Sequence, residues 1–289
     1  MELLRDSILA VSLAAAAAAL YARAASSLLR PGLPRLAALL PVLALLAAAP
    51  LACASSAIVR GVAAFFLAWL GAFKVALLAA GRGPLDPALP VLPFLFTALL
   101  PVKLRRAGAA GGASEAKSVS LGMETEPQFD RPYLASSLRD FWGRRWNLMV
   151  SAILRPSVYD PVRARAGNAA GVLAAFLVSG LMHEGMVCYL SLRRPDGGMT
   201  AFFLLHGVCC VAEGWCARRW ATMRWPSPPC AVATVLVGLF VEGTSFWLFF
   251  PALLKDGVEE RFLEEWAAVA AVFQDAGGKI ASLYGQRST

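Results

Sequence analysis

Long apolar runs that carry almost no charge constrain this chain more than any other feature. They include residues 8–20, 36–54 and 230–254. A helix of about 18 or more apolar residues is long enough to cross the hydrocarbon core of a bilayer. Hydrophobic residues make up 58% of the chain and charged residues 16%, whereas soluble domains are about half apolar and a quarter charged. The sequence therefore predicts an all-α, polytopic transmembrane helix bundle.

We expect about seven spans, with interfacial or re-entrant helices in the 134–160 region. The predicted spans cover residues 7–23, 36–54, 56–80, 88–102, 167–190, 200–216 and 230–254. The fourth is short and contains three prolines, so a tilted, kinked or partly inserted helix is also consistent with it. A retained first span is favoured over a signal peptide, because Glu2 and Asp6 offset Arg5 ahead of the first apolar run.

These segments form one predicted membrane-embedded domain, residues 1–289, in four parts. They are the N-terminal spans (1–103), a cytosolic loop with an amphipathic helix (104–166), the catalytic spans (167–254) and a C-terminal tail (255–289). Within 134–155 the apolar side chains follow helical spacing, and a polar stripe occupies the opposite side. That stripe consists of Asp140, Arg144, Asn147 and Ser151. We expect this helix to end near Arg155 and Pro156.

The net charge of +8 admits nucleic acid, a membrane surface or an anionic ligand as partner. Nucleic acid is not expected, because the charges lie at the edges of apolar runs. If all four early segments span, the N-terminus, the 103–165 region and the 217–229 loop share one side. That side holds most of the arginines, which indicates the cytosol. Binding of an anionic substrate is compatible with this arrangement.

Metal and cofactor chemistry has little support in the sequence. The six cysteines contain no C-x-x-C pair, and the chain has two histidines, so we expect neither a metal site nor a cofactor. The motifs G-x-S-x-G, G-x-x-x-x-G-K-[ST] and H-x-x-x-x-D are absent from the sequence. A soluble-type hydrolase or a nucleotide enzyme is therefore not indicated.

Polar groups inside the predicted spans are the best candidates for function, because such groups are costly in lipid. His183 lies within the fifth span, and Ser179 and Gly180, one turn earlier, are small enough to leave room for a ligand. A neutral imidazole there could act as a general base, or it could only pack against a neighbouring helix. For His206 the structural interpretation is favoured. Arg60 and Lys74 are expected to be structural, either snorkelling or pairing with a buried acid.

Two blocks of the sequence resemble the signatures of plant wax synthases, which are long-chain-alcohol O-fatty-acyltransferases related to the membrane-bound O-acyltransferase superfamily. The first block, residues 137–148, reads S-L-R-D-F-W-G-R-R-W-N-L. The second, residues 179–184, reads S-G-L-M-H-E, and R-P-S-V-Y at 155–159 and F-F-L-L-H-G at 202–207 follow the same pattern. The resemblance covers about residues 130–220.

The resemblance implies direct transfer of a fatty acyl group from acyl-CoA to a long-chain alcohol, within the endoplasmic reticulum membrane. His183 matches the family histidine and would act as the base, while Asn147 would orient a reactant or polarise the thioester carbonyl. The residues expected to contact substrate are Arg144, Arg145, Trp146, Ser179 and Glu184. The partners are then fatty acyl-CoA, a fatty alcohol and the lipid bilayer. The sequence does not determine the oligomeric state.

Other functions remain open at this point. The same chemistry could act on a sterol or a diacylglycerol, and the Ala- and Leu-rich N-terminal third leaves the acceptor undetermined. A transporter would be expected to show two related halves with broken helices, and no such repeat is visible. A catalytically silent lipid-binding homologue would be expected to lack His183 or Asn147, and both are present.

Overall fold

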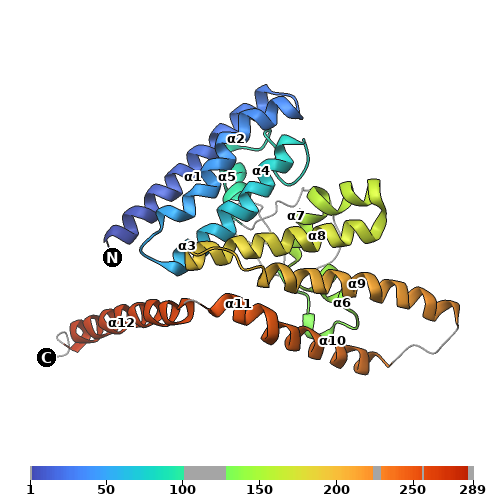
Figure 1. Ribbon diagram of the computed structural model, residues 1–289. Coiled ribbons are helices and arrows are strands. Elements are labelled where there is room, and N and C mark those ends of the chain that lie inside the picture. The colour runs from blue at the N-terminus through green and yellow to red at the C-terminus, as the bar shows by residue number, and fades with distance from the viewer. Residues whose placement is uncertain (1, 101–127, 224–228, 256, 286–289) are drawn as a thin grey trace.

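The computed structural model describes residues 2–100, 128–223, 229–255 and 257–285 and confirms an all-α bundle (Figure 1). Six of its helical segments are long and apolar enough to cross a membrane. They are Ser7–Leu28, Leu33–Ala52, Ala57–Ala79, Leu148–Ser191, Gly198–Thr222 and Cys230–Leu254. The described residues therefore contain six candidate spans, one fewer than the sequence predicted.

The N-terminal third packs as a bundle of its own. Its elements are α1 (Glu2–Leu28), α2 (Leu33–Ala48), η1 (Ala49–Ala52), α3 (Ala57–Ala63), the π-helical turn η2 (Ala64–Gly71), α4 (Ala72–Ala79) and α5 (Val91–Leu99). Elements α3, η2 and α4 follow one another without a break and form one span. Buried alanines of α1, including Ala15 and Ala22, lie in one apolar cluster with Leu39 of α2 and Phe94 of α5. These small side chains let the helices pack closely.

Helix α5 replaces the predicted span at 88–102. Its nine residues rise about 14 Å, which is less than half of the ~30 Å hydrocarbon core. The helix starts after Pro90 and gives way to extended backbone at Leu100. The prediction of a spanning helix here is therefore wrong for the described residues. Residues 101 and 102 of that predicted span lie outside them.

The segment before α8 is a series of short helices rather than the predicted amphipathic helix over 134–155. It consists of η3 (Pro132–Leu134), α6 (Leu138–Asp140), η4 (Phe141–Arg145), α7 (Leu148–Leu154) and η5 (Arg155–Tyr159). The break falls at Asn147, which has φ 43° and ψ 61° and begins α7. Asparagine tolerates this left-handed conformation better than most residues. The predicted end at Arg155 is also wrong, because the chain continues helically into α8.

Helix α8 (Asp160–Ser191) folds back on itself at Gly167, whose φ of 86° and ψ of 174° are not helical. Tyr159 Oη donates a hydrogen bond to Asn168 Oδ1 across this turn (2.6 Å). A Cβ on Gly171 would lie 3.1 Å from the Tyr159 carbonyl oxygen, so the two arms are closely packed. Figure 1 shows α7 and the long arm of α8 lying side by side. The predicted start of the fifth span, at residue 167, coincides with this turn.

The C-terminal part consists of two antiparallel spans and a terminal helix (Figure 1). Its elements are α9 (Gly198–Thr222), α10 (Cys230–Thr244), the π-helical turn η6 (Ser245–Phe249), α11 (Phe250–Leu254) and α12 (Val258–Gly285). Helix α9 packs against α8. Helix α12 returns to the N-terminal part, where the Glu265 carboxylate accepts hydrogen bonds from the backbone N–H groups of Ala57 and Ile58 (2.6 and 3.1 Å).

The loss of one early span changes the predicted topology. The predicted sharing of one side assumed that all four early segments span. With three candidate crossings before α5, the start of α1 would lie on the side opposite to α6 and α7. Glu213, near the end of α9, accepts a hydrogen bond from Leu138 N (2.9 Å), which places α6 beside the end of α9. Arg30 and Arg82 follow α1 and α4 and thus join this arginine-rich side. The charge bias toward a cytosolic α6–α7 region becomes stronger.

Candidate active site

His183 lies in the long arm of α8 and is held by its own helix. Its Nδ1 atom is 2.7 Å from the Ser179 carbonyl oxygen. Because a carbonyl oxygen only accepts, Nδ1 carries the ring proton and Nε2 keeps a free lone pair. No other hydrogen bond to this ring occurs among the described residues. The arrangement leaves a neutral imidazole with an unoccupied basic nitrogen.

Aromatic rings from three other segments surround this imidazole. Phe203 of α9 stacks on it, with ring centroids 4.2 Å apart. Trp69 of η2 meets it edge-on at 4.8 Å, and Phe249 of η6 lies at 6.3 Å. Two of these three residues sit in π-helical turns, a feature that is frequent at functional sites. The site is therefore apolar on several sides and is built from parts of the chain far apart in sequence.

Gly180 lets α9 approach this part of α8, and it does not leave the room for a ligand that the sequence suggested. A Cβ at Gly180 would lie 2.9 Å from Thr200 Cα and 3.2 Å from Phe203 Cβ. The space beside the glycine is thus filled by α9. Ser179 is buried, and its carbonyl oxygen orients the imidazole. Its predicted contact with substrate stays a prediction.

Glu184 points to the start of α9 rather than to the imidazole. Its carboxylate accepts hydrogen bonds from the backbone N–H groups of Asp196, Gly197 and Thr200 at 2.9–3.1 Å, and from the Thr200 hydroxyl at 3.3 Å. These donors are among the groups that a helix leaves unpaired at its N-terminus. The contacts support a structural role, and none of them supports the predicted contact with substrate.

Asn147 lies in the same neighbourhood as His183, but no hydrogen bond joins the two residues. Its Oδ1 accepts a hydrogen bond from Val150 N (3.3 Å) and so caps α7. Trp142, five residues earlier, packs against Phe203 at 5.7 Å, and Phe203 stacks on His183. Val150 of α7, whose N–H Asn147 caps, lies in one buried cluster with Trp69, and the Trp69 ring meets the imidazole edge-on. Its side-chain N–H₂ group makes no hydrogen bond within the part of the chain that the structure describes.

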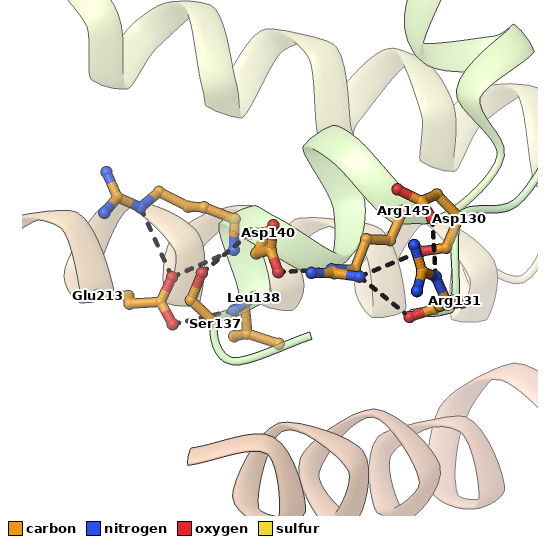
Figure 2. Close-up of polar contacts among 8 residues, drawn as sticks. Asp130, Arg131, Ser137, Leu138, Asp140, Arg145 and Glu213 are labelled. Carbon is orange, nitrogen blue, oxygen red and sulfur yellow. Dashed lines mark hydrogen bonds and ion pairs between the residues drawn. The ribbon is translucent and has the colours of Figure 1, made fainter. Parts of the chain in front are cut away.

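The two neighbouring arginines of the predicted substrate site differ in their surroundings. Arg145 Nε donates to Asp140 Oδ2 (2.6 Å), and Nη1 donates to the carbonyl oxygens of Asp130 and Arg131 (3.3 Å each), as Figure 2 shows. The hydrogen bond to Asp140 raises the pKa of the Arg145 guanidinium. Arg144 is exposed and has no hydrogen bond or ion pair among the described residues. Arg144 alone is thus free to bind an anion.

The rest of this segment is anchored to α9 and to itself. Glu213 of α9 accepts hydrogen bonds from the backbone N–H groups of Leu138 and Arg139 (2.9 and 3.2 Å), and Figure 2 shows Glu213 beside Leu138. Trp146 stacks on Phe141 with centroids 5.3 Å apart, and its ring is partly exposed. Trp146 could therefore still contact a substrate, as predicted, although it does not touch the imidazole.

His206 is a structural residue, as the sequence indicated. Its ring is fully buried, and Nδ1 accepts a hydrogen bond from Trp142 Nε1 (3.0 Å). Nε2–H then donates a hydrogen bond to Thr244 Oγ1 (2.9 Å), whose own hydroxyl donates to the Phe240 carbonyl oxygen (2.7 Å). Both ring nitrogens are occupied, so the imidazole ties η4, α9 and α10 together and has no nitrogen left for a substrate.

Comparison with known proteins identifies the family. Residues 125–205 match the model of the membrane bound O-acyl transferase family. An acyl-CoA–sterol O-acyltransferase of Arabidopsis thaliana is 34% identical over 76% of this chain and 83% of its own length. A probable long-chain-alcohol O-fatty-acyltransferase of the same plant is 37% identical over 82% and 86%. The long-chain-alcohol O-fatty-acyltransferase of Simmondsia chinensis is 33% identical over 89% and 92%. The chain belongs to the wax synthase family of membrane-bound O-acyltransferases.

As a member of the wax synthase family, the protein is an O-acyltransferase. The matched residues 125–205 include Trp142, Asn147, His183 and Phe203. They do not include Trp69, whose position beside His183 was not predicted from the sequence either. The available signal was weak: Trp69 is the only tryptophan in the first 141 residues of the sequence, which are rich in alanine and leucine. No cluster of three or more metal-ligating side chains occurs among the described residues.

Trp142→Phe should destabilise the protein, because it removes the donor to His206 Nδ1 in a fully buried site. An unpaired buried acceptor costs about 1–3 kcal/mol. We expect a lower melting temperature and lower accumulation in membranes, measured by fluorescence-detected size exclusion after heating. Trp247→Phe is the matched control, since Trp247 is exposed and makes no hydrogen bond among the described residues. Equal melting temperatures for the two variants would contradict the structural role of this bond.

Proposed function

We propose that this wax synthase homologue transfers the acyl group of a fatty acyl-CoA to a long-chain fatty alcohol, forming a wax ester and free CoA at the endoplasmic reticulum membrane. One observation carries the proposal. A spanning helix presents an imidazole whose Nδ1–H is held by the Ser179 carbonyl and whose Nε2 is free. A base of this kind suits an alcohol, which is a poor nucleophile until its proton is removed.

In the proposed reaction, His183 Nε2 takes the hydroxyl proton while the alcohol oxygen attacks the thioester carbon. A new C–O bond forms, and the electron pair of the carbonyl moves onto its oxygen. When that intermediate collapses, the C–S bond breaks. The sulfur takes the proton back from His183 and leaves as the thiol of CoA. The base is thereby regenerated, and no further reactant is needed.

Asn147 and Arg144 have distinct proposed roles. The free amide N–H₂ of Asn147 would orient acyl-CoA, at the point where the polar segment meets the spans. Arg144 would bind a phosphate of the CoA head, because a guanidinium can donate two hydrogen bonds to one phosphate group. The head cannot enter hydrocarbon, so an exposed arginine on the cytosolic side suits it. The long-chain alcohol would arrive laterally from the bilayer.

A sterol acceptor is the second candidate, because one relative that aligns over most of both chains is named a sterol acyltransferase. The two acceptors can be compared directly in cells that lack their own neutral-lipid acyltransferases. Such cells would express the full chain and receive fatty alcohol and sterol in separate cultures. We expect wax esters as the main product, identified by mass spectrometry. If the cells form sterol esters but no wax esters, the acceptor in this proposal is a sterol and not a fatty alcohol.

His183→Ala should abolish ester formation while the protein still accumulates in membranes. Loss of a general base costs about 100- to 10,000-fold in rate, and the imidazole bonds only to its own helix. The rate is measured with labelled acyl-CoA in microsomes and normalised to the amount of protein. Turnover close to wild type would contradict the assignment of the base.

Asn147→Gly separates a functional role from a purely structural one. Glycine adopts the left-handed conformation of residue 147 without strain, so the backbone should be preserved and the amide lost. We expect near-normal accumulation with lower turnover. Asn147→Ala is the comparison, since it loses the amide and also strains the backbone. A glycine variant with full activity would leave Asn147 as a cap of α7 only.

Arg144→Gln should raise the KM for acyl-CoA and leave that for alcohol unchanged, because its guanidinium is free to bind phosphate. Arg145→Gln breaks the bonds to Asp140, Asp130 and Arg131, so it should lower the melting temperature instead. Steady-state kinetics and thermal stability of both variants provide the test. An unchanged KM for acyl-CoA in Arg144→Gln would remove this arginine from the CoA site.

A further inference from the structure

Trp69 carries a buried hydrogen-bond donor without an acceptor. The residue is 2% exposed, and its indole Nε1 has no hydrogen-bond partner. Among the described side chains, only Ser26 Oγ shares this condition. Buried polar groups are nearly always paired, and an exception calls for an explanation. Trp142, the other tryptophan close to the site, follows the rule and donates to His206.

The position of this donor connects it to the proposed base. The Trp69 ring meets the His183 ring at 4.8 Å between centroids, with an interplanar angle of 73°. Phe65 packs edge-on against the indole at 5.5 Å. Trp69 also belongs to a buried cluster with Val150 and Ile153 of α7. The indole is therefore held in place by two segments beside the imidazole whose Nε2 is free.

We propose that the Trp69 indole N–H donates a hydrogen bond to the thioester carbonyl oxygen of acyl-CoA and stabilises the negative charge on that oxygen during transfer. This inference rests on the proposed function. As the alcohol oxygen attacks the carbon, its proton passes to His183 Nε2, and the carbonyl electron pair moves onto the oxygen that Trp69 faces. When the C–S bond breaks, that pair re-forms the C=O bond, and the thiolate takes the proton from His183.

The chemistry of the indole suits this task. The group is neutral and donates only, so it can be buried in an apolar span without the cost of a charge. A donor that is free before the reaction does not have to break a bond in order to reach the oxyanion. Donors of this kind act most strongly when they are fixed in place and water is excluded. The base and the donor lie on adjacent rings, with centroids 4.8 Å apart.

Trp69→Phe is the direct test, because phenylalanine keeps an aromatic ring and removes the N–H. Removal of one oxyanion donor typically lowers kcat about 100- to 1,000-fold. We expect a loss of this order with little change in the KM for acyl-CoA, measured with the full-length protein in detergent. Trp247→Phe is the matched control, since it makes the same substitution at an exposed indole, and it should keep a kcat near wild type. An unchanged kcat in Trp69→Phe, or an equal loss in both variants, would overturn the proposal.

Two further measurements keep the test decisive. Trp69→His, which restores a ring N–H, should recover part of the kcat that Trp69→Phe loses. On wild-type protein, a 2-oxoalkyl-CoA, which keeps a carbonyl near the thioester position, should inhibit more strongly than an alkyl-CoA thioether, which has none. Equal inhibition by the two analogues would overturn the proposal even if the variants did not accumulate.

Failure of this inference can be told apart from failure of the proposed function. One outcome is that wild type forms esters, that His183→Ala forms none and that Trp69→Phe retains its full rate. This outcome rejects only the role of Trp69. If wild type forms no ester from acyl-CoA and either acceptor, the proposed function itself is rejected.

Discussion

The bonding of buried charged side chains to the ends of helices is the interaction on which this structure depends. A helix leaves about four carbonyl groups and four N–H groups unpaired at its ends, and in apolar surroundings water cannot satisfy them. Arg60 is 2% exposed and donates to the carbonyl oxygens of Tyr189, Leu190, Cys53 and Ala54. Lys74 bonds in the same way to Thr97 and Leu100 at the end of α5 (2.8 Å each).

Acidic side chains bond in the same way to the N-terminal ends of helices, where they accept hydrogen bonds from unpaired N–H groups. Glu184 accepts from the first turn of α9, Glu213 from α6 and Glu265 from α3. Each of these bonds joins elements that are distant or antiparallel, so the charges determine which helix ends meet. Arg60 fixes α3 against the end of α8, while Glu184 fixes the start of α9 at the same place. The span that carries Trp69 and the helix that carries Phe203 are thereby held on either side of His183.

The sequence was sufficient for the features that follow from hydropathy and local motif. The all-α bundle, the helical setting of His183 and the structural nature of His206, Arg60 and Lys74 could all be predicted. The hydrogen-bond partners of Arg60 and Lys74 could not be predicted. A buried cation can bond either to a carboxylate or to backbone carbonyl oxygens, and the sequence does not distinguish the two. The short α5 was mistaken for a span because its prolines and apolar residues do not reveal where the helix ends.

The arrangement of the site depended on contacts between distant segments and was mostly beyond the sequence. Helical periodicity over 134–155 concealed the break at Asn147, since one residue in the left-handed conformation leaves the apolar spacing almost unchanged. Arg144 and Arg145 look equivalent in sequence, yet only Arg145 faces the carboxylate of Asp140. Trp69 could not be assigned to the site, because its proximity to His183 results from the packing of the N-terminal spans against α7 and α8.

The surroundings of His183 differ from those of the histidine in a catalytic triad. In catalytic triads an aspartate orients the imidazole and stabilises its protonated form. Here the Ser179 carbonyl orients the ring through Nδ1–H, and no carboxylate contacts the ring among the described residues, since Glu184 bonds to α9. In the proposed mechanism the imidazole is neutral before the reaction, as a general base must be. In the proposed mechanism it is charged only while it holds the alcohol proton, and the stacked face of Phe203, 4.2 Å away, can then stabilise the cation. Phe203 is held there by its packing against Trp142 and by the close contact at Gly180. The packing of α9 against α8 therefore places an aromatic face beside the imidazole that becomes charged in the proposed mechanism.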